Sequence, residues 1–330
     1  MGLRGYVAKR VVYSLILIWA VITVNFLIFS MLPGDPMQQF VTSLKGNIDE
    51  ERYAELRQNF GLDRPMHERY LTSLGNMITF NFGVDTISGE PVFDHMRTPL
   101  LNTLLLMGIS AIISIIAGIL LGVIAAYKRD SILDTILTTG SLVTYSVPIF
   151  FVGWILILFF AVQLHWFPAG GIAPIEWSRN PPTNILQYMS GRLSYIFLPA
   201  LTLFLFSVGG WILFTRACIL ETINEDYVLT ARAKGLKERT VLYKHVLKNA
   251  ALPLVTNVAL AFAFLVSGAI ITETLFSYNG MGLLTWNAIY PVPILPTLQA
   301  VFYISGLLVI IANFIADLLY GVIDPRVRYG

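Results

Sequence analysis

Between two long apolar segments the sequence reads Asn224-Glu225-Asp226-Tyr227-Val228-Leu229-Thr230-Ala231-Arg232-Ala233-Lys234-Gly235-Leu236-Lys237-Glu238-Arg239. The polar block continues through Lys244, His245 and Lys248 to Leu252-Pro253. A dense, basic, helix-forming loop between two membrane spans favours a surface that a soluble partner recognises. The alternative is a solvated loop that only sets the topology of the chain through its positive charge.

The composition of the 330-residue chain predicts an all-α integral membrane protein. Hydrophobic residues make up 56%, charged residues only 13%, and the mean hydropathy is +0.70. A soluble domain carries roughly a quarter charged residues. The single cysteine, Cys218, excludes an internal disulfide, and the four histidines lack metal-ligand spacing.

A bilayer core of about 30 Å needs about 20 apolar residues in a helix. Six segments satisfy this length, and Pro148 interrupts the third. They are Val11–Leu32, Leu100–Tyr127, Ile136–Val162, Ile196–Thr215, Ala251–Phe276 and Leu298–Tyr320. The chain therefore divides into residues 1–32 with the first span, an external loop over 33–99, and a five-helix core over 100–330.

The distribution of Lys and Arg predicts the orientation of the spans. Residues 1–10, 128–131, 216–250 and 321–330 hold most of the basic residues. The positive-inside rule places these segments, and so both termini, in the cytosol. The first apolar run exceeds a typical signal-peptide core and lacks a small-x-small cleavage site, so it is predicted to remain as an anchor.

The external loop over 33–99 carries two apolar stripes at helical spacing, which predict a folded cap on the span ends. The first stripe is Tyr53, Leu56 and Phe60, followed by Gly61. The second is Met66, Tyr70, Leu74 and Met77, after Pro65. A folded cap also offers a docking surface for an external protein.

The cytosolic loop over 216–250 predicts two helices with a break between them. Thr222 and Glu225 fit a capping box at the start of the first helix. Gly235 fits the left-handed position at its end, and the second helix covers 237–250. The small residues Ala231, Ala233 and Gly235 suggest one flat side that allows close docking into a groove.

This block resembles the EAA loop of ATP-binding-cassette importer permeases, and the dipeptide/oligopeptide branch in particular. That branch has Asp-Tyr-Val-x-Thr-Ala-Arg-Ala-Lys-Gly-Leu, followed by His-x-Leu-x-Asn-Ala-x-Leu-Pro. Matching stretches include Leu32-Pro33-Gly34-Asp35-Pro36, Gly61-Leu62-Asp63, Tyr145-Ser146, Thr272-Glu273-Thr274 and Asp324-Pro325-Arg326. Asn81-Phe82-Gly83 departs from the Gly-Asp-Leu-Gly usual in the branch. The resemblance covers nearly the whole chain.

The resemblance implies a type I importer permease fold in the cell membrane, with six transmembrane helices and a cytosolic coupling helix. It implies the first permease subunit of a di- or oligopeptide importer. Expected partners are a second permease, two cytosolic ATPases and an external solute-binding protein, with no nucleic acid. The residues that would dock the ATPases are Glu225, Asp226, Tyr227, Thr230, Ala231, Arg232, Ala233, Lys234, Gly235 and Leu236.

The same resemblance implies a non-catalytic subunit that binds no cofactor itself, with ATP and Mg bound by the ATPases. The sequence agrees, since it holds no Gly-x-x-x-x-Gly-Lys-Ser/Thr run. Candidate gate or pathway residues are Glu273, Phe276 and Pro148. Glu273 and Asp317 are expected at the membrane interfaces, and Arg216 is expected to snorkel.

Other functions remain open from the residues alone. A self-contained secondary transporter or channel would show midplane charges or internal repeats, and neither is evident. An intramembrane enzyme would need a motif such as His-Glu-x-x-His, which is absent. If the chain is an importer permease, oligosaccharides or other solutes are alternatives to peptides as its substrate.

Gly118 and Gly122 share one helix face and predict close helix packing.

Overall fold

The computed structural model describes residues 3–31, 63–85, 87–264, 269–291 and 293–323. Within these residues the regular secondary structure is helical, apart from an isolated antiparallel bridge between Val84 and Pro91, and irregular loops connect the helices. It divides into two compact units. Unit 1 comprises Met1–Thr103, Val266–Ile270 and Asn279–Gly330, and unit 2 comprises Leu104–Leu265 and Ile271–Tyr278.

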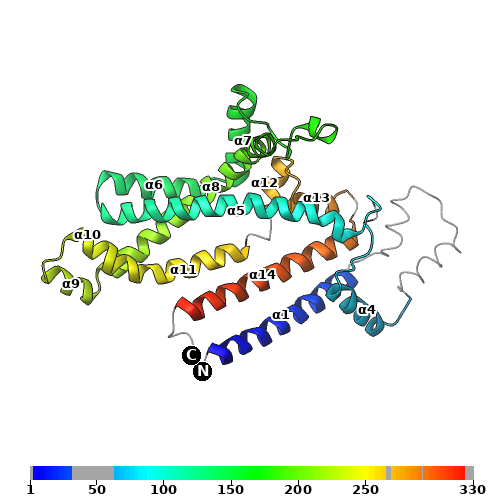
Figure 1. Cartoon of the computed structure of the whole chain (residues 1–330), viewed down its shortest axis with the longest axis horizontal. Helices are drawn as coiled ribbons and strands as arrows, with labels where there is room; N and C mark the ends of the chain where they lie inside the picture. The colour runs from blue at the N-terminus through cyan, green and yellow to red at the C-terminus, as the bar shows by residue number, and fades with distance from the viewer. Residues whose placement is uncertain (1–2, 32–62, 86, 265–268, 292, 324–330) are drawn as a thin grey trace. The chain divides into compact units, whose positions relative to one another are not determined.

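The helices lie along the sequence as follows (Figure 1). They are α1 (Leu3–Met31), α4 (Met66–Ile78), α5 (Val92–Tyr127), α6 (Ile132–Ser146), α7 (Ile149–Leu156), η1 (Ile157–Gln163), η2 (Ile175–Ser178), α8 (Ile185–Ile223), α9 (Asp226–Ala233), α10 (Glu238–Thr240), η3 (Val241–Val246), α11 (Leu247–Phe264), α12 (Ile270–Leu275), α13 (Met281–Ile289) and α14 (Leu295–Ile323).

Four of the described helices are long and apolar enough to cross a membrane: α1, α5, α8 and α14. Helix α6 and the continuous segment of α7 and η1 meet at a bend of 98°. If they count as one broken span, the described residues contain up to five spans. The predicted fifth span falls on α11 and α12, and residues 265–268 between them lie outside the described part. The number of six spans therefore stays a prediction.

The predicted interruption of the third span is confirmed as a full break at Pro148. Helix α6 ends at Ser146, and Val147 is extended with φ −78° and ψ 130°. A proline disfavours the helical conformation of the residue before it, which explains why the break falls there. The chain then starts α7 directly after Pro148 in a new direction.

In unit 1, α1 and α14 pack along each other, so that the start of α1 lies beside the end of α14 (Figure 1). Arg10 and Asp317 form an ion pair of 2.8 Å there. The Tyr6 hydroxyl donates to the backbone oxygen of Asp317 at 3.0 Å. Asp317 is therefore paired with a cation near the start of α1. This position agrees with the prediction that both termini lie on the same side of the membrane.

Helix α4 confirms the second apolar stripe of the external loop. It begins after Pro65, and Met77 is buried in the core of unit 1 beside Leu74. Tyr70 makes an edge contact with Phe26 of α1, and its hydroxyl lies 2.8 Å from the Thr23 hydroxyl. The first stripe, Tyr53 to Phe60, lies outside the described residues.

Asp85 fixes a turn of the external loop onto α14. Its Oδ1 accepts hydrogen bonds from the Ile87 and Ser88 amides, and its Oδ2 accepts one of 2.6 Å from the Thr297 hydroxyl. Burial by itself would raise the pKa of Asp85. The hydrogen bonds from Ser88, Thr297 and Ile87, with His95 nearby, outweigh burial and hold this pKa below its usual value.

We expect Asp85→Ala to lower the free energy of unfolding of unit 1 by about 1–3 kcal/mol at neutral pH, because three donors lose their acceptor. A carboxyl with a lowered folded pKa stabilises the protein above its unfolded pKa. That contribution disappears as the pH falls through the folded pKa. The gap between wild type and variant should therefore persist down to about pH 4 and shrink below it.

Melting temperatures of the two purified proteins in detergent across this pH range measure the effect. Thr297→Val is the matched variant, since it removes a single donor and should cost less than Asp85→Ala. Equal melting of Asp85→Ala and wild type at neutral pH would contradict the role assigned to this turn.

In unit 2, three glycines allow α5, α6 and α8 to approach closely. A Cβ on Gly118 would overlap the Cβ of Trp211, and one on Gly122 would lie 2.6 Å from the Cβ of Thr215. A Cβ on Gly209 would lie 2.6 Å from the backbone oxygen of Ser141. These distances confirm the predicted packing role of the glycine pair in α5 and add a third close contact between α6 and α8.

Candidate functional site

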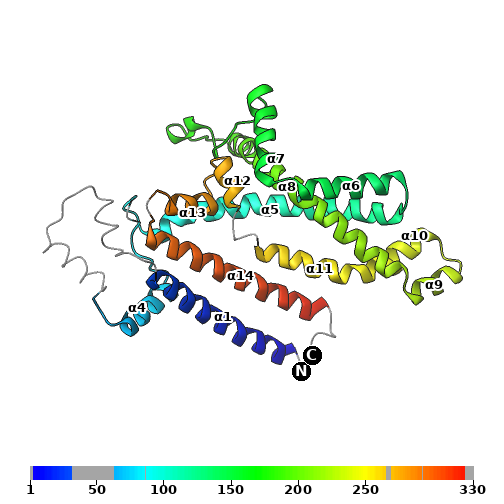
Figure 2. The same cartoon turned by 180° about the vertical axis from the view of Figure 1, so that it is seen from behind.

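The polar block over residues 216–250 forms a helix, a glycine turn and a second helix at one end of unit 2 (Figure 1 and Figure 2). In both views α9 and α10 lie at the end of unit 2 opposite to α7 and α12. The predicted arrangement of helix, glycine break and helix is confirmed. The block is thus an extension of α8 and α11 beyond the other helices of this unit.

The predicted capping box at Thr222 is wrong. Helix α8 continues to Ile223, and the Thr222 hydroxyl donates to the backbone oxygen of Cys218 within that helix. Helix α9 starts after Glu225, whose side chain makes no capping hydrogen bond. Ile223, the last residue of α8, is partly buried against an apolar cluster, so packing extends this helix past the local capping signal.

Gly235 ends α9 as predicted. It has φ +74°, a left-handed conformation that costs L-residues energy and suits glycine. Its amide donates to the Arg232 oxygen at 2.8 Å, and the Leu236 amide donates to the Ala231 oxygen at 3.4 Å. These two bonds form a Schellman motif, which satisfies free carbonyls at the helix end.

The inner side of α9 is held by an apolar cluster. Val228 has no exposed surface and Ala231 is 5% exposed. Both pack with residues of α5, α8, η3 and α11, among them Val123, Ile219 and Val246. We call this group the coupling cluster; its buried members are Val123, Ala126, Cys218, Ile219, Val228, Ala231, Val241, Leu242, Val246, Ala250 and Leu254.

The predicted flat face needs a correction at Ala231. Ala231 and Ala233 are two residues apart and point to opposite sides of a helix. Ala231 faces the coupling cluster, whereas Ala233 is exposed. The small side chain of Ala231 is therefore explained by packing inside the chain, and it is not available to a partner.

The outer side of α9 carries the remaining residues of the predicted docking set. These are Glu225, Asp226, Tyr227, Thr230, Arg232, Ala233, Lys234, Gly235 and Leu236, and all are exposed. Leu229 belongs with them, at 55% exposed, although it was not in the predicted set. Arg232 forms an ion pair of 2.7 Å with Glu238, which ties the exposed side of α9 to α10.

The second helix of the block continues farther than predicted. It begins with α10 and η3, where the turns widen to π-helical geometry, and it continues as α11 past Pro253 to Phe264. Pro253 lies inside α11 and is therefore not a boundary. The coupling cluster reaches Leu254, so this helix is anchored on both sides of the proline.

Asp134 and Arg216 form a contact that the sequence analysis missed. Arg216 of α8 donates from Nε to Oδ1 of Asp134 at 2.7 Å and from Nη2 to Oδ2 at 2.8 Å. The Asp134 side chain is 6% exposed. Arg216 is thus paired with a carboxylate inside the chain, and the expectation that it snorkels to the interface stays a prediction. The two residues are 82 positions apart, so no spacing signal connects them.

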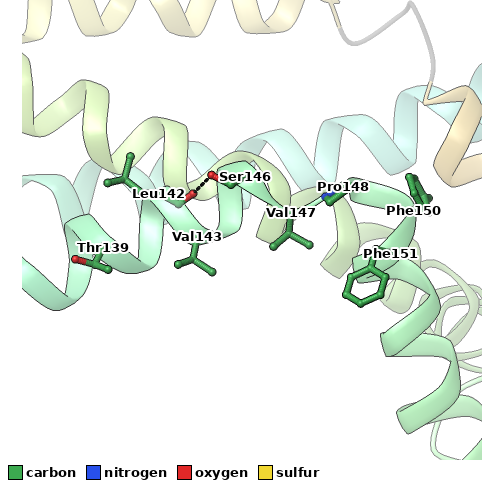
Figure 3. Close-up of a pocket in the computed structure, with 8 residues that line it drawn as sticks. All are labelled: Thr139, Leu142, Val143, Ser146, Val147, Pro148, Phe150 and Phe151. Atoms are coloured by element: carbon green, nitrogen blue, oxygen red, sulfur yellow. Dashed lines mark hydrogen bonds between the residues drawn. The ribbon is translucent and has the colours of Figure 1, made fainter.

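The candidate gate residues lie in two different places in unit 2. Pro148 borders an apolar groove at the bend between α6 and α7 (Figure 3). The groove has a volume of about 590 Å³, and its lining residues are Thr139, Leu142, Val143, Ser146, Val147, Pro148, Phe150 and Phe151.

Glu273 and Phe276 do not reach this groove, and both have no exposed surface. The Phe276 backbone oxygen accepts a hydrogen bond of 2.8 Å from the Gly171 amide. The expected interfacial Glu273 is therefore enclosed by the chain. Neither residue lines an open path in this structure, and a gating role for them stays a proposal.

Comparison with known proteins identifies the family to which the chain belongs. Residues 118–329 match the family described as "Binding-protein-dependent transport system inner membrane component". This range includes α6, α8 and the whole polar block over residues 216–250. The chain belongs to this family. With its long apolar helices, it is a multi-pass membrane protein.

Full-length relatives are similar across the whole chain. The oligopeptide transport system permease protein AppB of Bacillus subtilis (strain 168) is 34% identical over 328 residues, which cover 99% of this chain and 100% of that protein. The di/tripeptide transport system permease protein DppB of Pseudomonas aeruginosa (strain UCBPP-PA14) is 34% identical over 339 residues, with 98% and 99% covered.

A solved structure confirms the fold of this inner membrane component. A chain of the MetNI methionine ABC transporter, in an inward-facing form, matches with a TM-score of 0.53. The match covers 69% of this chain and 96% of that chain at 15% identity. At this identity the likeness concerns the fold alone, which is that of an ABC importer permease.

Proposed function

We propose that this chain is a permease subunit of an ATP-binding-cassette importer for di- and oligopeptides. The full-length similarity to permeases named for oligopeptide and di/tripeptide transport supports the substrate class. The observation that carries the proposal is α9 itself. It is a short helix with an anchored inner side and an exposed outer side, placed where one unit of the fold ends.

Such a helix suits the transfer of force from a soluble partner. Its outer side offers Tyr227 and Leu229 together with charged residues, a mixture that fits a groove on a protein partner. Its inner side packs on α5, α8 and α11 through the coupling cluster. Displacement of α9 would therefore move the inner ends of these helices with it.

The remaining parts of the assembly follow from this role. A second, related permease would complete the translocation path, and an external solute-binding protein would deliver the peptide. Two ATPase subunits would bind α9 and its counterpart and would hold ATP and Mg. The chain would itself hydrolyse nothing. Both termini and the α9 block would face the cytosol, as the distribution of basic residues predicts.

The direct test is purification of the tagged chain from its native membrane in mild detergent, followed by identification of the copurified proteins. We expect a second permease and two ATPase subunits. The accompanying solute-binding protein should bind di- and oligopeptides in calorimetry. Binding of oligosaccharides instead would overturn the substrate class. A chain that purifies alone and transports in liposomes without ATP would be a secondary transporter or channel.

The exposed charges of α9 are expected to tune the affinity for the ATPase subunits. The double variant Asp226→Ala, Arg232→Ala should bind purified ATPase subunits more weakly, by about 2- to 5-fold, because single surface charges contribute little. Since Arg232 pairs with Glu238, loss of Arg232 also frees α9 from α10.

Glu238→Ala separates these two effects, because it breaks the pair and keeps the Arg232 charge. Lys248→Ala is the charge control, because this residue is exposed on α11 and lies outside the predicted docking set. Unchanged affinity of the double variant, measured by surface plasmon resonance on the purified permease, would count against docking through these charges.

A further inference from the structure

Asp134 connects three parts of unit 2 through its two carboxylate oxygens. Both oxygens accept from Arg216 of α8 in a bidentate arrangement. The Thr138 hydroxyl donates to Oδ1 at 3.1 Å, and the Asp130 amide donates to Oδ2 at 3.0 Å. The carboxylate thus joins α8, the first turns of α6 and the turn before α6 in one network.

The Arg216 side of this network leads directly to α9. Cys218 and Ile219, within one turn after Arg216, belong to the coupling cluster that holds Val228 and Ala231 of α9. Only Asn224 and Glu225 separate α8 from α9. Any displacement of α9 therefore reaches the segment of α8 that carries Arg216.

The Asp134 side of the network leads to the bend at Pro148. Helix α6 packs along α8, with Ser141 so close to Gly209 that no side chain fits between them. Helix α6 then runs to Ser146 and the break. The apolar groove of Figure 3 lies on the far part of this same helix.

Apolar contacts and a bidentate ion pair constrain a helix pair in different ways. Apolar side chains repack when helices slide, whereas two parallel N–H···O bonds fix both the distance and the relative rotation of the groups. Replacing a buried ion pair by apolar residues of similar volume is often neutral for stability. The geometry of Asp134 and Arg216 therefore suits a role in orientation more than one in stability.

We propose that Asp134 and Arg216 are positioning residues that link α9 to the bend at Pro148, so that movement of α9 changes the orientation of α6. This inference rests on the proposed function. Without the pair, α8 would still follow α9, but α6 would slip along α8. ATP would then be hydrolysed with little transport.

The test uses the whole transporter, purified with its ATPases, second permease and solute-binding protein and placed in liposomes. Uptake of radiolabelled trialanine and ATP hydrolysis are measured together, and the readout is peptide transported per ATP. The decisive variant is Asp134→Leu, Arg216→Met. We expect a wild-type amount of assembled complex and about tenfold less peptide per ATP, which corresponds to about 1.4 kcal/mol.

A second ion pair between two helices, among the residues that the structure describes, offers a matched control. Arg10 and Asp317 connect α1 and α14 at 2.8 Å in unit 1, whereas α9 belongs to unit 2. The variant Arg10→Met, Asp317→Leu should transport as much peptide per ATP as wild type. A similar loss in both double variants would show a general effect of removing ion pairs and would overturn the proposal.

Two single variants cover the case in which the double variant does not assemble. Arg216→Lys keeps the charge but loses the bidentate geometry, and Asp134→Asn keeps the shape but loses the charge. Normal peptide per ATP in any assembled variant of the pair overturns the proposal, as does failure of all three to assemble. If wild-type liposomes show no ATP-dependent trialanine uptake, the proposed function itself fails, which is a distinct result.

Discussion

Replacement of Gly235 by valine is expected to abolish most transport while the protein still inserts into the membrane. A Cβ at this position would meet no atom within 4 Å, so the substitution creates no clash. The cost comes from the backbone, since φ is +74° and the left-handed conformation costs an L-residue about 1–2 kcal/mol. A free-energy difference of about 1.4 kcal/mol changes the equilibrium constant between two conformations about tenfold.

The turn would relieve this strain by changing the direction of the chain between α9 and α10. The Schellman bonds from Gly235 and Leu236 would be lost, and the exposed side of α9 would no longer face its partner as a rigid surface. We expect transport per assembled permease to fall by about tenfold or more. Uptake assays on membranes with equal amounts of the permease measure the effect.

Two variants make the interpretation specific. Gly235→Asn should keep most transport, because asparagine tolerates the left-handed conformation better than other L-residues. Gly140→Val adds the same side chain to α6 at another place with open space and ordinary helical geometry. A stable Gly235→Val protein with normal transport would refute the role of this turn.

The second large effect is expected from Gly118→Ala in the membrane-embedded part of unit 2. The new Cβ would overlap the Cβ of Trp211, and a backbone-linked atom of this kind cannot rotate away. Helices α5 and α8 would have to separate. Overpacking typically costs about 1–3 kcal/mol and occasionally more. We expect a lower melting temperature in detergent and less protein in the membrane.

Gly108→Ala is the matched control, because it is the same change in the same helix with nothing within 4 Å. It should be neutral or stabilising, since glycine in a helix costs about 0.5–1 kcal/mol relative to alanine. Gly122→Ala should resemble Gly118→Ala, because its Cβ would lie 2.6 Å from Thr215 Cβ. Identical melting of Gly118→Ala and Gly108→Ala would disprove close packing of α5 on α8.

Local and periodic features of the fold were predictable from the sequence. The long apolar runs predicted α1, α5, α8 and α14, and the residues after Pro65 predicted α4. Gly235 predicted the end of α9, because few other residues adopt its backbone conformation at low cost. These features depend on residues close together in the chain, which is the range that sequence patterns report.

Features that depend on tertiary contacts were missed or misread. The capping signal at Thr222 failed because packing of Ile223 against the coupling cluster carries α8 beyond it. Ala231 suggested a docking face, but it fills space beneath α9. Arg216 suggested snorkelling because its partner, Asp134, is 82 residues away and no local pattern connects them. The sequence shows which residues are small or charged. Their contact partners become known only from the three-dimensional structure.

The anchoring of α9 by residues from distant parts of the chain has a consequence for biogenesis. Val228 finds its place only when α5, α8 and α11 are all present, and α11 is made after α9 itself. During synthesis, α9 therefore leaves the ribosome before its support exists. A soluble subunit that requires the anchored helix would ignore the nascent chain and recognise only the finished unit. The cluster that is proposed to transmit force would thereby also make subunit binding depend on a completed unit 2.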